Sequence, residues 1–439
     1  MRKKLKKKYR GYGMEELASR STFKSYLFFW SGQLFSLMGS LVVQFAITWW
    51  ITVETGSALY LSIGSFLYFL PMVFLTPIAG VLIDRWDRKK LIATVDSLQS
   101  LVTIWIIVLF YSGTADPLGV MLINSLRGVC QAFHMPAVNA IVPTMIPKDK
   151  LSRINGVGYL FTSLIQLIGP VIGAVLIAFL SLNLILWIDI FTFAIALIPL
   201  LLVRIPNVRN LVQQSERTQT KSFRRDFKEG ILTIKVIPGM IILLILDMIL
   251  NFLVAPVNVL LPLYIKDIHL GTALDLAFIS MFLNGGMILG GLITTIKKKW
   301  KNKTTVYFIG LMFLMGLLSV LGFAPTRAFV VLWGGTGMVG LLLPIINTIY
   351  MTIIQTTVPP DKMGRVSSVL QSLSSAIFPI GTIIAGPLAE VIGIRSVFLY
   401  GSLIGVLVVF LTWRFTKVRH VDYDNFQLII DKINNIKIK

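Results

Sequence analysis

Between two long apolar runs, the chain reads Gly80-Val-Leu-Ile-Asp84-Arg85-Trp-Asp87-Arg88-Lys89-Lys90, with six charged side chains in eleven residues. The runs on either side cover residues 58–83 and 91–112. Each is longer than the roughly 20 residues that an α-helix needs to cross the hydrocarbon core of a bilayer. A short charged turn between two such runs is typical of two membrane-spanning helices joined at one membrane surface.

The same pattern continues along the whole chain of 439 residues, of which 55% are hydrophobic and 14% are charged. Soluble domains carry about a quarter of charged residues, so the composition excludes an ordinary soluble protein. Further apolar runs cover 26–52, 118–142, 154–180 and 184–203, and then 240–265, 276–296, 305–324, 329–355, 366–392 and 397–415. We therefore predict an all-α polytopic membrane protein with twelve transmembrane helices in two six-helix bundles.

The basic residues indicate the orientation of these helices. Of the 41 lysines and arginines, 37 lie in the two terminal segments and in alternate loops between the runs, which is the distribution expected of a cytoplasmic side. Both termini are then cytoplasmic, and we expect a multi-pass protein of the plasma membrane. The net charge of +21 is explained by this pattern together with contacts to anionic lipids, so we do not expect nucleic-acid binding.

Five segments follow from these runs. They are a basic tail over 1–25, a first bundle over 26–203, a linker over 204–239, a second bundle over 240–415 and a C-terminal tail over 416–439. The linker has Phe223, Phe227, Ile231 and Ile234 at helical spacing between charged residues, which predicts an amphipathic cytosolic helix.

The two predicted bundles contain an internal repeat. At an offset of 212 residues, Pro147, Asp149, Lys150 and Arg153 correspond to Pro359, Asp361, Lys362 and Arg365. Two bundles with the same orientation and related sequences are typical of transporters whose halves are related by an axis along the membrane normal. In such proteins the substrate site lies between the halves and opens to one side at a time.

The loop quoted above resembles the cytoplasmic signature of the major facilitator superfamily. The resemblance extends over most of the chain and implies twelve helices related by a pseudo-twofold axis. It also implies a conformational latch made of Gly80, Asp84, Arg85, Arg88 and Lys89, in which the carboxylate of Asp84 faces the start of the helix near residue 366. The alternative is a solvated charged turn that serves only to orient the helices.

The fifth run contains Gly169-Pro170-Val171-Ile172-Gly173, which resembles the antiporter motif of drug exporters in that superfamily. Glycines spaced four apart also allow membrane helices to pack closely, so a structural role is the alternative. Thr55-Gly56-Ser57-Ala58 and Phe133-His134-Met135-Pro136 are similar to the branch that includes bacterial macrolide exporters. The resemblance implies proton-coupled efflux of hydrophobic or amphiphilic molecules.

Four ionisable residues lie inside the predicted spans, namely Asp96, Arg127, Asp189 and Asp247. Such residues are costly in a bilayer and usually serve a function, so they are our candidates for proton coupling. Asp96 could instead pair with Lys90, and Arg127 with Asp96 or with Asp189. Asp247 could exchange a proton, or could simply be hydrogen-bonded near Asn251.

The expected substrate cavity has few polar groups, for which Gln33, Gln44, Asn251 and Asn347 are the candidates. Such a mainly apolar wall suits a large amphiphilic molecule. A siderophore, lipid or peptide exporter, or an importer, remains the alternative on the same fold. The single cysteine, the scattered histidines and the absence of a P-loop sequence predict no metal site, no cofactor, no enzyme activity and no ATP drive. We expect a functional monomer whose partners are protons, lipids and a small molecule.

Overall fold

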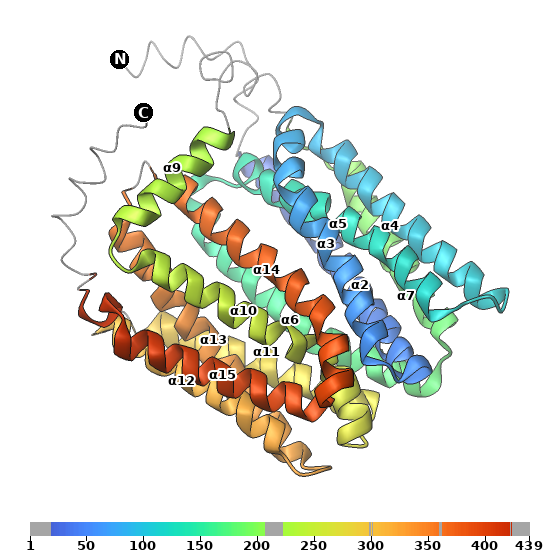
Figure 1. The fold of residues 1–439 in the computed structure, drawn as a ribbon. Coiled ribbons are helices and arrows are strands. Elements are labelled where there is room, and N and C mark those ends of the chain that lie inside the picture. The colour runs from blue at the N-terminus through green and yellow to red at the C-terminus, as the bar shows by residue number, and fades with distance from the viewer. Residues whose placement is uncertain are drawn as a thin grey trace, which may run out of the picture. The chain divides into compact units, whose positions relative to one another are not determined.

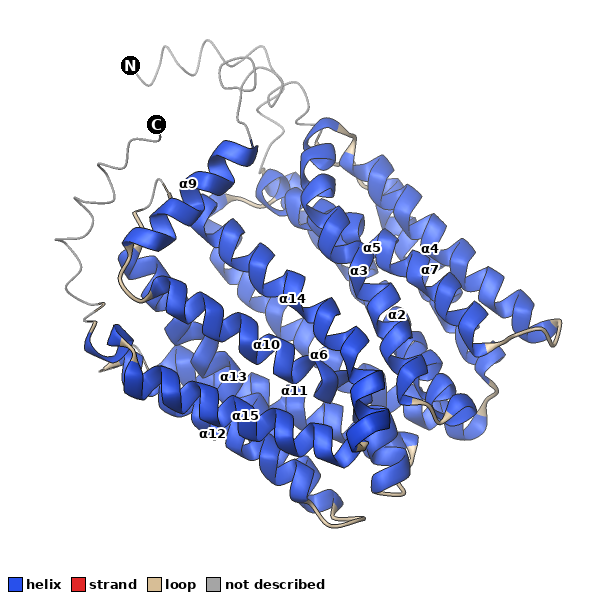
Figure 2. Ribbon diagram, in the orientation of Figure 1, coloured by secondary structure: helices blue, strands red, loops and turns tan. Residues whose placement is uncertain are grey.

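The computed structural model describes residues 19–206, 223–297, 300, 302–359, 362–421 and 423. Within these ranges the chain forms thirteen α-helices and no β-strand. Figure 2 draws the described residues as helices and connecting loops. The predicted all-α fold is confirmed. Residues 1–18 of the predicted N-terminal tail, residues 207–222 of the linker and most of the C-terminal tail lie outside the described residues, as does Asp361 of the repeated loop.

The helices fall into two compact units. Unit 1 holds the described residues up to Ile47 and those from Leu67 to residue 206. Its helices are α2 (Arg20–Thr55), α3 (Ala58–Arg85), α4 (Arg88–Tyr111), α5 (Pro117–Met145), α6 (Leu151–Phe179) and α7 (Leu182–Leu202). The segment Thr48–Phe66, at the end of α2 and the start of α3, belongs to unit 2. Within unit 1, α4 packs along both α5 and α7 (Figure 1).

Unit 2 contains this segment and the described residues from 223 onward. Its helices are α9 (Phe223–Val236), α10 (Met240–Leu263), α11 (Ala273–Ile296), α12 (Lys303–Phe323), α13 (Phe329–Thr357), α14 (Met363–Ile392) and α15 (Ile394–Phe415). A π-helical turn, Tyr264–Ile268, extends α10. Helices that are not consecutive in the sequence pack together. α10 lies along α14, α11 along α13 and α12 along α15 (Figure 1).

Eleven of the described helices are long and apolar enough to cross a membrane. The two that are not are α9, which has 14 residues, and α5, which has 29 and would extend about 43 Å. α5 is the fourth helix of the predicted twelve, and its apolar character is interrupted by Asn124, Arg127, Gln131 and His134. The chain is therefore a multi-pass membrane protein, and the predicted count of twelve differs from the observed count at this one polar helix.

Local sequence signals explain where the helices of unit 1 begin. Asp87, in the quoted loop, is the N-cap of α4, and its carboxylate accepts a hydrogen bond of 3.2 Å from the backbone nitrogen of Lys90. Asp116 caps α5 in the same way by accepting from the backbone nitrogen of Gly119, and Pro117 occupies the first turn. Both arrangements satisfy backbone N–H groups that a helix leaves without partners at its start.

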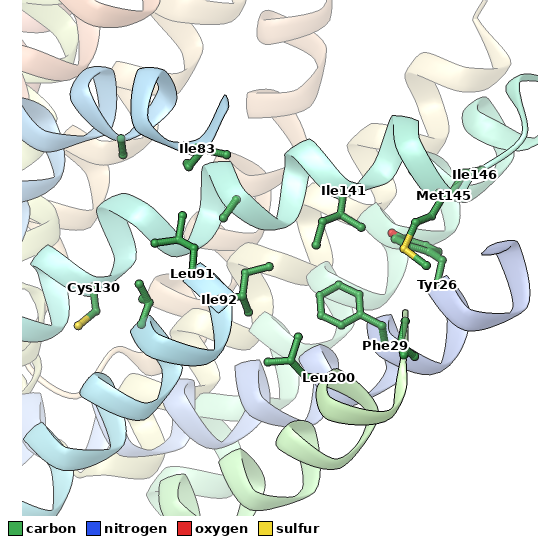
Figure 3. Close-up of a cluster of buried hydrophobic side chains, with 14 of the residues drawn as sticks. Tyr26, Phe29, Ile83, Leu91, Ile92, Cys130, Ile141, Met145, Ile146 and Leu200 are labelled. Atoms are coloured by element: carbon green, nitrogen blue, oxygen red, sulfur yellow. The ribbon is translucent and has the colours of Figure 1, made fainter. Parts of the chain in front are cut away.

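An apolar cluster holds unit 1 together, as Figure 3 shows. It joins Tyr26 and Phe29 of α2, Ile92 of α4, Ile141 of α5 and Leu200 of α7, which are all buried. These side chains come from four helices that are distant in the sequence. The cluster therefore determines how these helices are rotated about their axes, and so which of their polar residues meet.

In unit 2, α11 and α13 approach so closely that their backbones touch. A Cβ atom built at any of three glycines of this pair would collide with a backbone carbonyl oxygen of the other helix. The pairs are Gly286 with Gly337, Gly290 with Leu341, and Gly340 with Leu283. Small residues at such contacts let membrane helices gain van der Waals packing where lipid offers no hydrophobic driving force.

The linker helix α9 covers the segment predicted to be amphipathic, and it packs against α14. Ile234 is buried, and Glu229 accepts a hydrogen bond of 2.8 Å from the guanidinium of Arg365 near the start of α14. A Cβ atom at Gly230 would lie 2.9 Å from the carbonyl oxygen of Arg365. The described part of the linker is therefore attached to unit 2 by an ion pair and by close packing.

Candidate functional site

Arg127 and Asp189 form an ion pair in the interior of unit 1. The Nη1 atom of Arg127 lies 2.8 Å from Oδ2 of Asp189, and the two side chains are 3% and 5% exposed. The same carboxylate accepts hydrogen bonds from the hydroxyls of Thr103 at 2.7 Å and Ser40 at 2.9 Å. The pair links α5 to α7, with α4 and α2 contributing the hydroxyls. Of the two predicted partners of Arg127, the structure selects Asp189.

This pair belongs to a ladder of polar contacts between α4 and α5. The three rungs are Asp96 with His134, Gln99 with Gln131, and Thr103 with Arg127. From one rung to the next, the residue on α4 lies three or four positions further along the chain, and its partner on α5 lies the same number of positions back. One polar stripe on each antiparallel helix therefore faces the other. Gln99 also donates to the hydroxyl of Ser40, which connects the middle rung to Asp189.

At the first rung, the Nε2 atom of His134 lies 3.1 Å from Oδ1 of Asp96 and 3.0 Å from Oε1 of Gln33. The predicted pairing of Asp96 with Lys90 is wrong, because the carboxylate meets His134 and Lys90 is exposed. The reason is the rotation of α4. Leu91, Ile92 and Val95 turn into the apolar cluster of Figure 3, which directs Asp96 toward α5.

Asp247 lies on α10 in unit 2, and its carboxylate accepts a hydrogen bond of 2.5 Å from the hydroxyl of Ser374 on α14. Asn251, one turn along α10, donates to the backbone carbonyl of Asp247 at 2.9 Å, and its side chain also hydrogen-bonds to the carboxylate. Across the ranges that the structure describes, no basic side chain lies within ion-pair distance of Asp247. It therefore differs from Asp96 and Asp189, each of which meets a group that can carry positive charge.

Two basic side chains in the first turn of α4, Arg88 and Lys89, bind backbone carbonyl oxygens of α5 and of the end of α7. The ammonium group of Lys89 donates to the carbonyl oxygens of Leu201 at 2.7 Å and Val203 at 2.8 Å, at the end of α7. Arg88 donates to the carbonyl of Ala140 at 2.7 Å. A cation is favourable at the negative end of a helix, so these contacts stabilise the bundle.

The other three residues of the predicted latch, Gly80, Asp84 and Arg85, show no contact that tests it among the described residues. The side chains of Asp84 and Arg85 lie outside the described part of the chain. A Cβ atom at Gly80 would meet no described atom within 4 Å, so the structure contains no close contact there that requires glycine. The latch stays a prediction.

The glycines of the antiporter-like motif lie where α6 packs against α2. A Cβ atom at Gly169 would lie 3.1 Å from the Cβ of Leu41, and one at Gly173 would lie 3.2 Å from the carbonyl oxygen of Val42. Pro170 lies between them within the helix. Tight packing is thus one reason for these glycines, and a role in antiport stays a prediction.

The four candidate cavity residues divide between the units. Gln33 and Gln44 lie on α2, where Gln33 is buried against His134 and Gln44 is half-buried. Asn251 on α10 is half-buried, and Asn347 on α13 is exposed. A common cavity formed by these residues stays a prediction.

Comparison with known proteins decides the family. A sequence model of the Major Facilitator Superfamily matches residues 29–379, which is most of the chain. The chain belongs to the major facilitator superfamily. Membership agrees with the helical architecture, and it means that the chain handles a small-molecule substrate as a membrane transporter.

Within the superfamily, the chain is similar to proteins named for drug efflux. Macrolide efflux protein A of Streptococcus pyogenes is 30% identical over 395 residues, covering 90% of this chain and 96% of the relative. A protein of the same name from Enterococcus faecalis is 31% identical over 328 residues, covering 74% and 99%. The multidrug efflux pump Tap of Mycolicibacterium fortuitum is 28% identical over 384 residues, covering 85% and 92%.

Solved structures of other transporters share the fold. A bacterial homologue of the iron transporter ferroportin, solved in an inward-facing state, superposes with a TM-score of 0.66 at 19% identity, covering 90% of this chain and all of that one. The nucleoside transporter NupG also gives a TM-score of 0.66, at 15% identity and with 90% and 98% coverage. At such identities the likeness extends to the fold alone.

Sequence reasoning about this superfamily member missed His134, Ser40, Thr103 and Ser374 as members of the polar sites. A signal for His134 was nevertheless present. Asn124, Arg127, Gln131 and His134 recur at spacings of three or four, which is one face of a helix that must be buried or hydrated in a membrane. The hydroxyl residues had no such signal, because serine and threonine also occur in spans without a functional partner.

Proposed function

We propose that this chain is a secondary transporter that exports large, mainly apolar molecules of the macrolide type, driven by proton entry. Its similarity to macrolide and multidrug efflux proteins over most of their length supports export and this class of cargo. We place both termini on the cytoplasmic side of the plasma membrane, with the bundles 26–203 and 240–415 alternating around a shared site in a functional monomer.

The observation that carries the proton coupling is the position of Asp247. Its carboxylate lies within α10, meets the hydroxyl of Ser374, and has no ion-pair partner among the described residues. An ionised carboxylate is costly in a dry environment unless it is paired or hydrated, whereas the protonated form is not. A carboxylate in this position can therefore bind a proton while it is shielded from water. It can release the proton when a conformational change of the transporter exposes it to water.

The energy available from this coupling is sufficient for resistance. One proton that enters down a membrane potential of 100 mV contributes about 2.3 kcal/mol. One unit of pH difference adds about 1.4 kcal/mol. For a neutral substrate exported with one proton, the sum supports a concentration ratio of roughly 500.

Export of a radiolabelled macrolide from pump-deficient cells tests the proposal. Cells that express the wild-type chain should accumulate less macrolide, and an uncoupler should remove the difference. Asp247→Asn should accumulate macrolide as the empty cells do, although it reaches the membrane in normal amounts. Asp267→Asn, which changes an exposed carboxylate just beyond α10, is the matched control and should export normally.

The outcomes separate the parts of the proposal. Unchanged macrolide accumulation despite normal membrane insertion would exclude this cargo, and a wider compound panel that includes siderophores, lipids and peptides would then identify another. Export that continues in Asp247→Asn at every external pH would exclude Asp247 as the coupling group. An N-terminal tag that is accessible from outside intact cells would exclude the proposed orientation.

A further inference from the structure

The cluster of Gln33, Asp96 and His134 in unit 1 determines which nitrogen of the histidine carries hydrogen. Nε2 faces two acceptors, Oδ1 of Asp96 at 3.1 Å and Oε1 of Gln33 at 3.0 Å. It must therefore be the donor, and the neutral ring then has a bare lone pair at Nδ1. The orientation of the Gln33 amide follows from the same network, because the reverse orientation would direct two N–H groups at each other.

Two atoms of this cluster are buried without a partner among the described residues, namely Nδ1 of His134 and Nε2 of Gln33. Gln33 is only 8% exposed, so bulk water does not satisfy its amide. Buried polar atoms without a partner are rare in folded proteins, and each one calls for an explanation such as a ligand that comes and goes. A proton is the smallest ligand that the lone pair of an imidazole nitrogen can accept.

We propose that His134, held by Asp96 and Gln33, is a proton-binding site in unit 1, separate from Asp247 in unit 2. A proton from the aqueous phase bonds to the lone pair of Nδ1, and the ring becomes an imidazolium whose Nε2–H group faces the carboxylate of Asp96. The charge of the pair changes from −1 to 0, and release reverses the step. This inference rests on the proposed proton coupling and names a second site for it.

The charges around the cluster suit this role. Arg127, about two turns from His134 along α5, and Asp189 of α7 neutralise each other. In the described part of unit 1, the buried carboxylate of Asp189 is thus already balanced by Arg127. The buried carboxylate of Asp96 meets only His134, so its charge is balanced only when His134 is protonated. The other described titratable or charged side chains on these four helices are Lys24, Tyr26 and Glu54 of α2, Tyr60 and Tyr68 of α3, Arg88, Lys89, Lys90 and Tyr111 of α4, and Cys130 of α5. Lys90 is exposed, and Arg88 and Lys89 bind carbonyl oxygens elsewhere.

The surroundings give the site a dry side and a polar side. Leu91, Ile92 and Val95 precede Asp96 on α4 within the apolar cluster of Figure 3, and Ala137 and Ile141 follow His134 on α5 in the same cluster. On the opposite side lie the rungs Gln99–Gln131 and Thr103–Arg127. Low-dielectric surroundings strengthen the attraction between Asp96 and a charged ring, and the ladder offers hydrogen-bonding groups along which a proton can approach.

Nitrogen-15 NMR of the purified chain tests the site without any measurement of transport. The chain has three histidines, so selective labelling gives few signals, and His134→Gln and His269→Gln assign them. We expect the Nε2–H tautomer at high pH and conversion of His134 to imidazolium across the pH range in which export is pH-dependent. Asp96→Asn should weaken proton binding by His134 by roughly tenfold or more, because it removes the adjacent charge.

Transport in liposomes completes the test. His134→Gln should retain downhill movement of macrolide but lose pH-driven uphill export, whereas Asp267→Asn should retain both. A His134 that stays neutral throughout that pH range, or a correctly folded His134→Gln variant that still concentrates macrolide, would overturn the inference. Insensitivity of the wild type to an uncoupler would instead refute the proposed coupling, and the NMR titration would still decide whether His134 binds a proton. Should His134→Gln fail to fold, the effect of Asp96→Asn on the NMR titration decides the question.

Discussion

The buried ion pair of Arg127 and Asp189 gives the most demanding test of the interior of unit 1. We consider Arg127→Met, which leaves the carboxylate with the hydroxyls of Thr103 and Ser40 but no positive charge. Asp189→Asn leaves the guanidinium, 3% exposed, with the hydroxyl of Thr103 at 2.7 Å and no negative charge. Removal of one partner from a buried pair costs about 3–5 kcal/mol, because the remaining charge stays in the interior unpaired.

The double variant, Arg127→Met with Asp189→Asn, carries neither charge. The amide that replaces the carboxylate of Asp189 can still bond to Thr103 and Ser40, so the free energy of unfolding should fall by less than in either single variant. If the two single losses were independent, the double variant would lose roughly 6–10 kcal/mol, which is comparable with the whole stability of a typical domain. The stability loss expected of the double variant is therefore much smaller if the two side chains form a coupled pair than if they act independently.

Unfolding of the purified chain by SDS in mixed micelles, followed by the fluorescence of its nine tryptophans, measures these differences. The exposed pair Lys266 and Asp267, with side chains that are 28% and 38% exposed, is the control. The cycle of Lys266→Gln and Asp267→Asn should give a coupling energy below about 1 kcal/mol. A double variant at Arg127 and Asp189 that is less stable than both single variants would refute the reasoning.

Three further predictions concern packing, pH and the charged loop. Gly290→Ala should destabilise the fold by about 1–3 kcal/mol, because its Cβ would meet the carbonyl oxygen of Leu341, whereas Gly291→Ala, with open space around it, should change the thermal midpoint little. Burial, together with the charge of Arg395, lowers the pKa of His269 below its usual 6.5, so the unfolded chain takes up a proton before the folded one as pH falls. Thermal unfolding should therefore show a stability loss below about pH 6.5 of at most about 1.4 kcal/mol per pH unit, none of it at pH 8, and His269→Gln should remove it. Lys89→Gln should cost about 1–3 kcal/mol through the lost bonds to the end of α7, and Lys90→Gln, at an exposed neighbour, should serve as a neutral control in the same unfolding assay.

Much of the fold could be predicted because it depends on short-range requirements. A segment that crosses a bilayer must satisfy its backbone hydrogen bonds within its own helix, so the length of each apolar run determines a span without reference to its neighbours. The exception is α5, which is 29 residues long but carries Arg127, Gln131 and His134 on one face. Its polar face is tolerated because α4 presents a matching stripe, and that match involves two helices at once.

The sequence by itself determined which ionisable side chains lie within the helices. Only the tertiary structure decided which of them meet. Asp96 and Asp189 were equally acceptable partners for Arg127, and the structure selects Asp189, 62 residues away in the chain. The physical reason is that the partner of a side chain depends on the rotation of its helix and on the order of the neighbouring helices. Packing of small residues and of the apolar cluster sets both, as where Gly128 of α5 lies against the backbone of Tyr68 in α3.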